Sequence, residues 1–270
     1  MGAVELTVAD LERSLAYYEK AIGLRTLERG GGRAALGTDG RELLVLVEEP
    51  GARPSIGHTG LFHFALLVPD RPSLARWLAH AARTRVPITG ASDHWVSEAL
   101  YLRDPDRHGI EIYADRPREL WEGKVARGMT TLPLDVDGLL RELDDPATSA
   151  FEGLPNGTTM GHVHLQVASI PETVDFYRDV LGFGLMTGMG DQAAFLGAGG
   201  YHHHLGANTW ESRGGTPPPP GTAALRHATI VLPDSAERDR IVERVGEVEE
   251  LDGEPLVRDP SGNALVLATG

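Results

Sequence analysis

Short segments in which apolar and polar residues alternate recur along the chain, and several are followed by a stretch with helical spacing. Residues 4–8 and 163–167 alternate in this way and predict half-buried strands. Residues 10–22 carry apolar side chains at helical spacing after a capping Asp10, which predicts a helix. The same helical pattern returns at residues 73–84. Further short strands are predicted at 43–47, 99–102 and 109–113.

The first part of this pattern occurs twice. Residues 2–24 align without a gap to residues 161–183, so that GAVELTVADLERSLAYYEKAIGL lies over GHVHLQVASIPETVDFYRDVLGF. Two further pairs follow in the same order: LFHFALLVPD resembles LRHATIVLPD, and RDPDRHGIEIYAD resembles RDPSGNALVLATG. The chain is therefore a duplicated module, with copies at 1–115 and 160–270.

Each module is itself double, because each half begins with a strand, continues with a helix and ends in strands. The predicted fold class is α+β, with four βαβββ units in two tandem modules. We expect curved, cup-like mixed sheets with the helices on the outside. Residues 116–159 break the pattern and are interpreted as a linker packed on the surface, with a short helix near 135–143. The segment GGTPPPPG at 214–221 is a loop.

Composition narrows the class of protein. The 270 residues contain 25 Lys and Arg against 39 Asp and Glu, a formal charge of −14, which argues against nucleic-acid or anionic-membrane partners. No apolar run is long enough to span a membrane, and no secretion signal follows Met1, so we expect a cytoplasmic protein. The chain has no cysteine. A transition metal would therefore have to be held by imidazole and carboxylate groups.

Strand alternation places several such groups on one face. His162 and His164 point to the same side of their strand, opposite Val163 and Leu165. Glu111 lies between two isoleucines and His63 between two phenylalanines, so both also point away from an apolar layer. Two histidines and one carboxylate are the ligand set of an open non-haem iron(II) site.

The chain resembles the vicinal oxygen chelate superfamily, which includes glyoxalase I, fosfomycin-resistance proteins and extradiol catechol dioxygenases. The segment DHWVSEALYLRDPDRHGIE at 93–111 is similar to the extradiol ring-cleavage signature, with His94, Tyr101 and Glu111 at its spacing. Ser92 and Arg107 depart from that signature; Arg107 stands where the signature has Gly in the turn. GHVHLQV together with YHHHLGANTW at 201–210 looks like the second module of two-module catechol 2,3-dioxygenase-like proteins.

The resemblance implies a set of metal ligands: a His on the first strand of one unit, a His on the first strand of another, and the Glu after Asp–Pro. Neither module carries all three, because Ala3 stands at the counterpart of His162 and Val266 at that of Glu111. We therefore expect a composite metal site, in which the second unit supplies His63 and Glu111 and the third supplies His162. The first and fourth units would form a second cup without a metal.

The same resemblance implies the catalytic residues. His203 matches the acid–base histidine of the family, and Tyr101 and His94 match its substrate-binding pair. All three belong to the units that supply the expected metal ligands.

Several alternatives remain open from the sequence. A rival metal site would use His162, His204 and His227, although a lone strand histidine such as His227 is more often a satisfied polar group. His164 shares the face of His162 and is left open as a neighbour of the metal site. Three aromatic residues are interpreted either as walls of a substrate pocket or as core: Trp95, Phe195 and Trp210. Three histidines are expected at the surface: His58, His80 and His108.

The function implied by the resemblance is Fe(II)-dependent extradiol cleavage of a catechol-type aromatic diol by O2 to a ring-opened semialdehyde, with Mn(II) as an alternative ion. The partners are then a small aromatic substrate and O2; a homo-oligomer is left open. A glyoxalase-type lyase or isomerase with Ni or Zn is one alternative, but it usually has four ligands. A metal-free small-molecule-binding protein of the resistance type is another.

Overall fold

The computed structural model describes all of residues 1–270 and contains four βαβββ units. Unit 1 consists of β1 (Val4–Val8), α1 (Leu11–Tyr17), β2 (Arg25–Gly30), β3 (Arg33–Thr38) and β4 (Arg41–Glu48). Unit 2 consists of β6 (Gly60–Leu67), α2 (Arg71–Thr84), β7 (Gly90–Asp93), β8 (Ser97–Arg103) and β9 (Gly109–Asp115). Unit 3 consists of β11 (Thr159–Gln166), α6 (Ile170–Asp175), β12 (Gly184–Gly188), β13 (Ala193–Gly197) and β14 (Leu205–Asn208). Unit 4 consists of β16 (Leu225–Leu232), α7 (Ser235–Val245), β17 (Glu249–Leu251), β18 (Glu254–Arg258) and β19 (Ala264–Thr269).

The helices of units 1 and 3 confirm the sequence repeat in detail. Each continues beyond its regular part as a π-helical turn, Tyr18–Ile22 in unit 1 and Phe176–Val180 in unit 3. Asp10 caps α1 by accepting a hydrogen bond from the backbone N–H of Arg13, as the sequence predicts.

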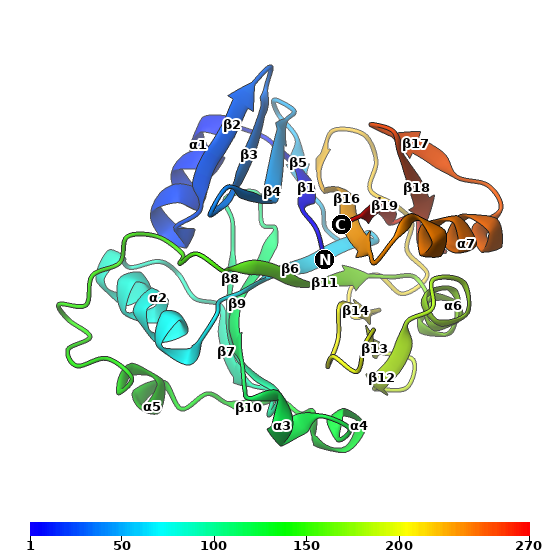
Figure 1. The fold of residues 1–270 in the computed structure, drawn as a ribbon. Coiled ribbons are helices and arrows are strands. Elements are labelled where there is room, and N and C mark those ends of the chain that lie inside the picture. The colour runs from blue at the N-terminus through cyan, green and yellow to red at the C-terminus, as the bar shows by residue number, and fades with distance from the viewer.

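The strands form two large sheets that join the units in a different order from the chain (Figure 1). The eight-stranded sheet has the order β17-β18-β19-β16-β1-β4-β3-β2, so unit 4 adjoins unit 1. The nine-stranded sheet has the order β10-β7-β8-β9-β6-β11-β14-β13-β12, so unit 2 adjoins unit 3. Antiparallel pairs β1–β16 and β6–β11 make these joints. The mixed sheets with peripheral helices confirm the predicted fold class.

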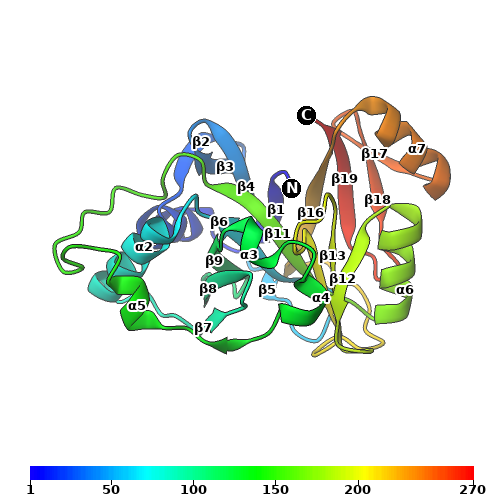
Figure 2. The ribbon, with the colours of Figure 1, turned by 60° about the horizontal axis from the view of Figure 1, so that its bottom comes forward.

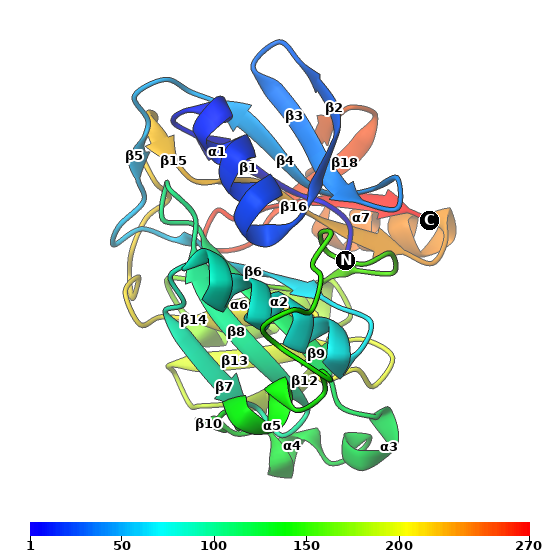
Figure 3. The same ribbon diagram turned by 90° about the vertical axis from the view of Figure 1, so that its left-hand side faces the viewer.

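The helices meet at the two sides of the molecule, where α2 packs against the π-helical turn that follows α1, and α7 against the one that follows α6 (Figure 1). Trp77 of α2 donates its indole N–H to the carbonyl of Ala21, and Arg244 of α7 donates to the carbonyl of Val180. Figure 3 shows α1 against the eight-stranded sheet and α2 against the nine-stranded one. One continuous apolar core of 49 residues runs through both sheets and all four units.

The linker contains more structure than its sequence indicated. It holds α3 (Arg118–Trp121), α4 (Val125–Gly128), β10 (Leu132–Pro133) and α5 (Val136–Leu140), the last within the predicted helix. Strand β10 extends the nine-stranded sheet beside β7, and α4 contacts β12 at the opposite end of the same sheet (Figure 2). Trp121, Val125 and Leu139 are buried. The linker therefore crosses from unit 2 to unit 3 as part of the packed molecule.

Two local features bear on the sequence reading. Arg107 has a φ of 72°, the left-handed conformation that favours glycine, at the turn position where the family signature has Gly. The expectation that His108 lies at the surface is wrong: its ring is buried and its Nε2 bonds the carbonyl of Thr7.

The short strands β5 (Arg53–Pro54) and β15 (Thr222–Ala223) pair in parallel beside the main sheets. No helix is long and apolar enough to cross a membrane.

Candidate metal centre and active site

Three adjacent strands in the middle of the nine-stranded sheet carry the predicted metal ligands. Strand β6 pairs with β9 on one side and with β11 on the other. Ala65 of β6 lies opposite Glu111 of β9 and opposite His162 of β11, while His63 lies two residues along β6 on the same face. Because Ala65 carries only a methyl group, the three larger side chains can meet above it.

The ligand atoms of these side chains converge at one point. The Nε2 atom of His63 lies 3.0 Å from Oε2 of Glu111, that of His162 lies 3.2 Å from the same oxygen, and the two Nε2 atoms are 3.3 Å apart. Ligands held about 2.1 Å from a divalent ion at right angles are about 3.0 Å apart. The spacing and the chemistry of this donor set therefore fit a metal ion. No other group of His, Asp or Glu side chains in the chain converges in this way.

The surroundings keep Glu111 and His162 in the protonation states that bind metals. Burial alone would raise the pKa of Glu111, but interactions with His162 and His63 hold that pKa well below its usual value. Burial lowers the pKa of His162, so its imidazole is neutral at pH 7. An anionic carboxylate beside a neutral imidazole is the form required for coordination.

A cavity of about 520 Å³ opens above the three ligands. Its walls come from units 2 and 3 and from the linker. The walls include the polar side chains of His94, Tyr101, His164 and His203 and the aromatic ones of Phe62, Phe195 and Trp210. Of the three aromatic residues considered from the sequence, Phe195 and Trp210 line the cavity. Trp95 does not, and packs beside Trp121 and Val125.

His94 and Tyr101 form a hydrogen-bonded pair on one wall. His94 Nδ1 lies 2.8 Å from the carbonyl oxygen of Thr130, which can only accept, so Nδ1 carries the proton. In the neutral ring Nε2 then accepts the hydroxyl hydrogen of Tyr101 over 2.7 Å. Burial and the nearby Glu111 raise the pKa of Tyr101 well above its usual value, which keeps the phenol protonated.

His203 stands on the other wall, directly beside a metal ligand. The centre of its ring is 4.1 Å from that of His162 and 5.2 Å from that of Phe195. The side chain is buried, and burial together with the neighbouring His162 and His202 lowers the pKa of His203 well below its usual value. A neutral imidazole at the cavity wall is able to accept a proton.

His164 also lines the cavity, and its environment is unusual. Neither ring nitrogen makes a hydrogen bond within the chain, and Nε2 is completely buried. The ring lies among those of His63, Phe62 and Trp210, and burial lowers its pKa well below the usual value. Opposite it in register is Gly206, where a side chain would collide with the imidazole at 2.8 Å. His164 is thus a neutral polar side chain in an aromatic setting.

The rival ligand set His162, His204 and His227 is not brought together. His204 accepts a hydrogen bond from the backbone N–H of Ala198 through Nδ1. His227 lies on β16 in the other sheet, opposite Glu5. In that sheet Glu5 forms ion pairs with Arg226 and Arg33, so the second cup carries a salt-bridge cluster.

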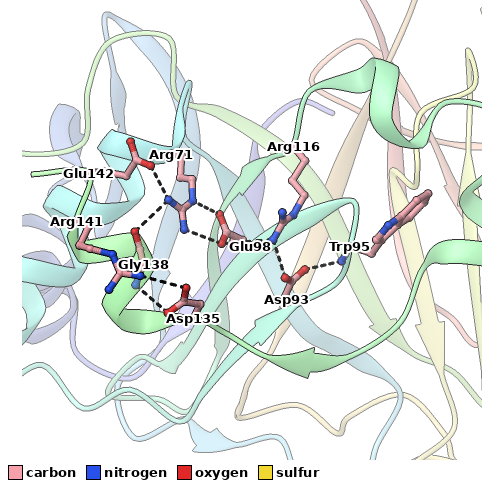
Figure 4. A network of polar contacts seen from close by, with 9 residues as sticks. All are labelled: Arg71, Asp93, Trp95, Glu98, Arg116, Asp135, Gly138, Arg141 and Glu142. Carbon is pink, nitrogen blue, oxygen red and sulfur yellow. Dashed lines mark hydrogen bonds and ion pairs between the residues drawn. The ribbon is translucent and has the colours of Figure 1, made fainter.

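A network of ion pairs supports the hairpin that carries His94 (Figure 4). The buried carboxylate of Glu98 accepts hydrogen bonds from Arg71 at the start of α2, and Arg116 pairs with Asp93 over 2.6 Å. Asp93 in turn accepts the backbone N–H of Trp95, whose φ of 68° is rare for a large residue. The network ties this strained turn, and with it His94, to α2 and to Arg116 after β9.

Part of the cavity wall consists of residues for which the sequence predicts no function. Met129, Thr130 and Thr131 of the linker line the cavity, as do Thr187 and Met189 near β12. For Met129, Thr130 and Thr131, only the position of the linker in the fold places them there, because nothing in their local pattern marks them. By contrast, the site residues His63, Tyr101, Glu111, His162 and His164 lie on strands whose alternation could be read.

A comparison with known protein families separates the four βαβββ units from the linker. The family model described as "Glyoxalase/Bleomycin resistance protein/Dioxygenase superfamily" matches residues 1–112 and 159–267. The chain belongs to this superfamily. Its matched segments contain all four βαβββ units, and the unmatched part is the linker with its short helices.

A curated member of the superfamily is similar over nearly the whole chain. The protein named catechol-2,3-dioxygenase from Bacillus subtilis (strain 168) is 42% identical over 278 residues, covering 98% of this chain and 95% of that protein. Solved structures share the fold at lower identity. A putative dioxygenase from Bacillus subtilis has a TM-score of 0.64 at 16% identity, covering all of this chain and 85% of that one. Glyoxalase I from Zea mays has a TM-score of 0.59 at 17% identity, with 100% and 92% covered.

Proposed function

We propose that the protein is an extradiol ring-cleavage dioxygenase that opens a catechol-type aromatic diol with O2 to a semialdehyde. The observation that carries this proposal is the convergence of His63, Glu111 and His162 at the base of a cavity with aromatic walls. Such a three-ligand set leaves positions on the metal for two further molecules. The similarity to a catechol-2,3-dioxygenase over almost the full length supports the same reaction class.

His63, Glu111 and His162 would hold iron(II), with manganese(II) as the alternative ion. When bound, this ion supplies the redox chemistry with O2 and a place where both diol oxygens bind. The single carboxylate leaves one positive charge on a divalent site, which favours an anionic diol. A site that holds Ni or Zn for a lyase reaction usually has a fourth protein ligand, and the chain brings none to this point.

The chain's own residues would handle the protons of the substrate. We assign His203 as the base that removes a hydroxyl proton from the diol and later returns one during ring opening. Tyr101 gives its single hydroxyl hydrogen to His94 in the substrate-free protein, and on substrate binding that hydrogen would turn to a substrate oxygen and stabilise the charge that develops there. Phe62, Phe195 and Trp210 exclude water and offer faces for a flat ring.

The test is anaerobic loading of the metal-free protein with Fe(II), followed by catechol in aerated buffer. We expect yellow semialdehyde to form with equal consumption of O2. Glu111→Gln should bind no iron and form no product, whereas Glu249→Gln, an exposed glutamate paired with Arg258, should match the wild type. Bound iron without product or O2 uptake would contradict the dioxygenase assignment. Absence of metal binding would favour a metal-free binding protein instead.

A further inference from the structure

A buried hydrogen-bond network lies behind His203, on the side away from the cavity. The loop between β13 and β14 carries His202, whose side chain is completely buried. Its Nε2 atom lies 2.8 Å from Oδ1 of Asp115, at the end of β9, and its Nδ1 atom lies 2.8 Å from Nδ1 of His203. The network therefore runs from Asp115 in unit 2 through His202 to His203 in unit 3.

The protons in this network can be placed by elimination. An ionised Asp115 only accepts hydrogen bonds, and it accepts one from Tyr201, whose hydroxyl is also 2.9 Å from that of Tyr113. His202 must therefore donate to it through Nε2–H. In a neutral His202 the other nitrogen, Nδ1, is then an acceptor, so the Nδ1 atom of His203 must be the donor. This leaves Nε2 of His203 without a proton.

The unprotonated nitrogen is the one available to the cavity. Nε2 of His203 makes no hydrogen bond within the chain, and the side chain of His203 lines the cavity beside His162. Without a partner at Nδ1, a histidine in water favours the opposite tautomer, with its proton on Nε2. A ring in that tautomer presents a donor where the proposed reaction needs an acceptor for the diol hydroxyl.

We propose that Asp115 and His202 are positioning residues that fix His203 as the Nδ1–H tautomer, with the lone pair of Nε2 directed to the substrate. The catalytic effect of this tautomer rests on the proposed dioxygenase function, whereas the assignment of the tautomer does not. The packing around His202 holds this network in place. Its ring centre is 4.0 Å from that of Tyr201 and 5.4 Å from that of Trp121, and this close packing restrains the ring beside Asp115.

Nuclear magnetic resonance of the full-length, metal-free protein tests the tautomer directly. With 15N-labelled histidine, the ring shifts should show a protonated Nδ1 and an unprotonated Nε2 for His203. His202→Phe keeps a ring in the aromatic cage but removes the acceptor, so His203 should move to the Nε2–H form. His202→Asn places an amide oxygen near the position of the lost Nδ1 and should restore the wild-type tautomer. The control is His80→Phe, because His80 lies on α2 and bonds the carbonyl of Lys20. This variant should leave the tautomer of His203 unchanged.

Activity provides the second readout. In the iron-loaded protein we expect His202→Phe to lower kcat for catechol about 10- to 100-fold with little change in KM or bound iron, and His202→Asn to recover most of it. A wild-type His203 with its proton on Nε2 would overturn the proposal, and so would a His202→Phe variant that keeps the wild-type tautomer. If the tautomers are as expected but the protein does not cleave catechol, the proposed function is rejected and the positioning role of Asp115 and His202 is retained.

Discussion

Tyr18 donates its hydroxyl hydrogen to the buried carboxylate of Asp104 over 2.9 Å, and thereby ties the helix of unit 1 to the Asp–Pro turn of unit 2. Tyr177 repeats this contact with Asp259 over 3.1 Å, between units 3 and 4. Units 1 and 2 belong to different sheets, as do units 3 and 4. The two tyrosines therefore link the sheets within each sequence module, while β6 and β11 join the modules at the metal ligands.

Replacing Tyr18 by Phe should destabilise the fold without altering its shape. Asp104 would keep the backbone N–H groups of Asp106 and His108 but lose its side-chain donor. A buried hydrogen bond to a charged group contributes about 1.5–3 kcal/mol, and we expect a loss of that size in the free energy of unfolding, measured with urea. Tyr17→Phe is the matched control. Its hydroxyl donates to a carbonyl near the surface, so a loss below about 1 kcal/mol is expected. Equal losses in both variants would contradict the special role of the Asp104 contact.

Metal binding should stabilise the protein through the three-ligand centre. With free metal at 100 times its dissociation constant, the expected gain in the free energy of unfolding is about 2.7 kcal/mol, seen as a rise in Tm. Glu111→Gln removes the charge shared by both histidines and should abolish the gain. The test is calorimetric unfolding of the metal-free protein with and without Mn(II) in both variants. A metal-dependent rise in Tm that survives Glu111→Gln would place the metal elsewhere.

Much of the architecture could be read from the sequence because alternation and repetition are local signals. The strict alternation in GHVHLQV puts His162 and His164 on one face, and both line the cavity. The gapless repeat predicts matching helices, and Leu11–Tyr17 and Ile170–Asp175 match, each followed by a π-helical turn. Because neither module contains all three metal ligands, the sequence predicts a metal site shared by units 2 and 3. The β6–β11 pair joins these two units.

The rest depends on contacts between distant segments. Thr130 meets His94 only because the linker folds back along β7, and its own sequence carries no sign of that. The hydrogen-bond network behind His203 joins Asp115 to His202, which are 87 residues apart. Strand alternation predicts which face a side chain lies on, but it does not predict this contact. His108 looks like a turn residue, yet the packing of units 1 and 2 buries it against Thr7.

Replacing His164 by Leu should make the metal-free protein more stable. The buried Nε2 atom has no hydrogen-bond partner, and an unsatisfied buried polar group costs about 1–3 kcal/mol. Leucine removes that group and suits a strand position among aromatic rings. We expect the free energy of unfolding to rise by about 1 kcal/mol in urea titrations. His80→Leu breaks a hydrogen bond and should have the opposite sign. A marked loss of stability in His164→Leu would indicate a partner for Nε2 in the folded protein.

Gly128→Ala tests whether the linker shapes the cavity. A methyl group at this position would meet the ring of Trp95 at 2.2 Å, so α4 must move away from the hairpin that carries His94. Met129 and Thr130 follow directly in the chain and line the cavity. We expect KM for catechol to rise about 3- to 30-fold while the iron content stays at the wild-type level. Gly30→Ala, where the added methyl group meets nothing within 4 Å, is the control for the substitution itself. Unchanged kinetics in Gly128→Ala would show that the linker does not shape the cavity.

The pH dependence of stability should carry a contribution from His204. Burial lowers its pKa to about 4, whereas the unfolded chain binds the proton near pH 6.5. Between these values the unfolded state holds more protons than the folded one, so stability falls as the pH falls. The slope from one such histidine is at most about 1.4 kcal/mol per pH unit. From pH 7 to pH 5 the stability advantage of the metal-free wild type over His204→Gln should therefore shrink by up to about 2 kcal/mol. Urea unfolding of both proteins at the two pH values measures this difference, and an advantage that stays constant or grows would show that His204 is protonated in the folded protein.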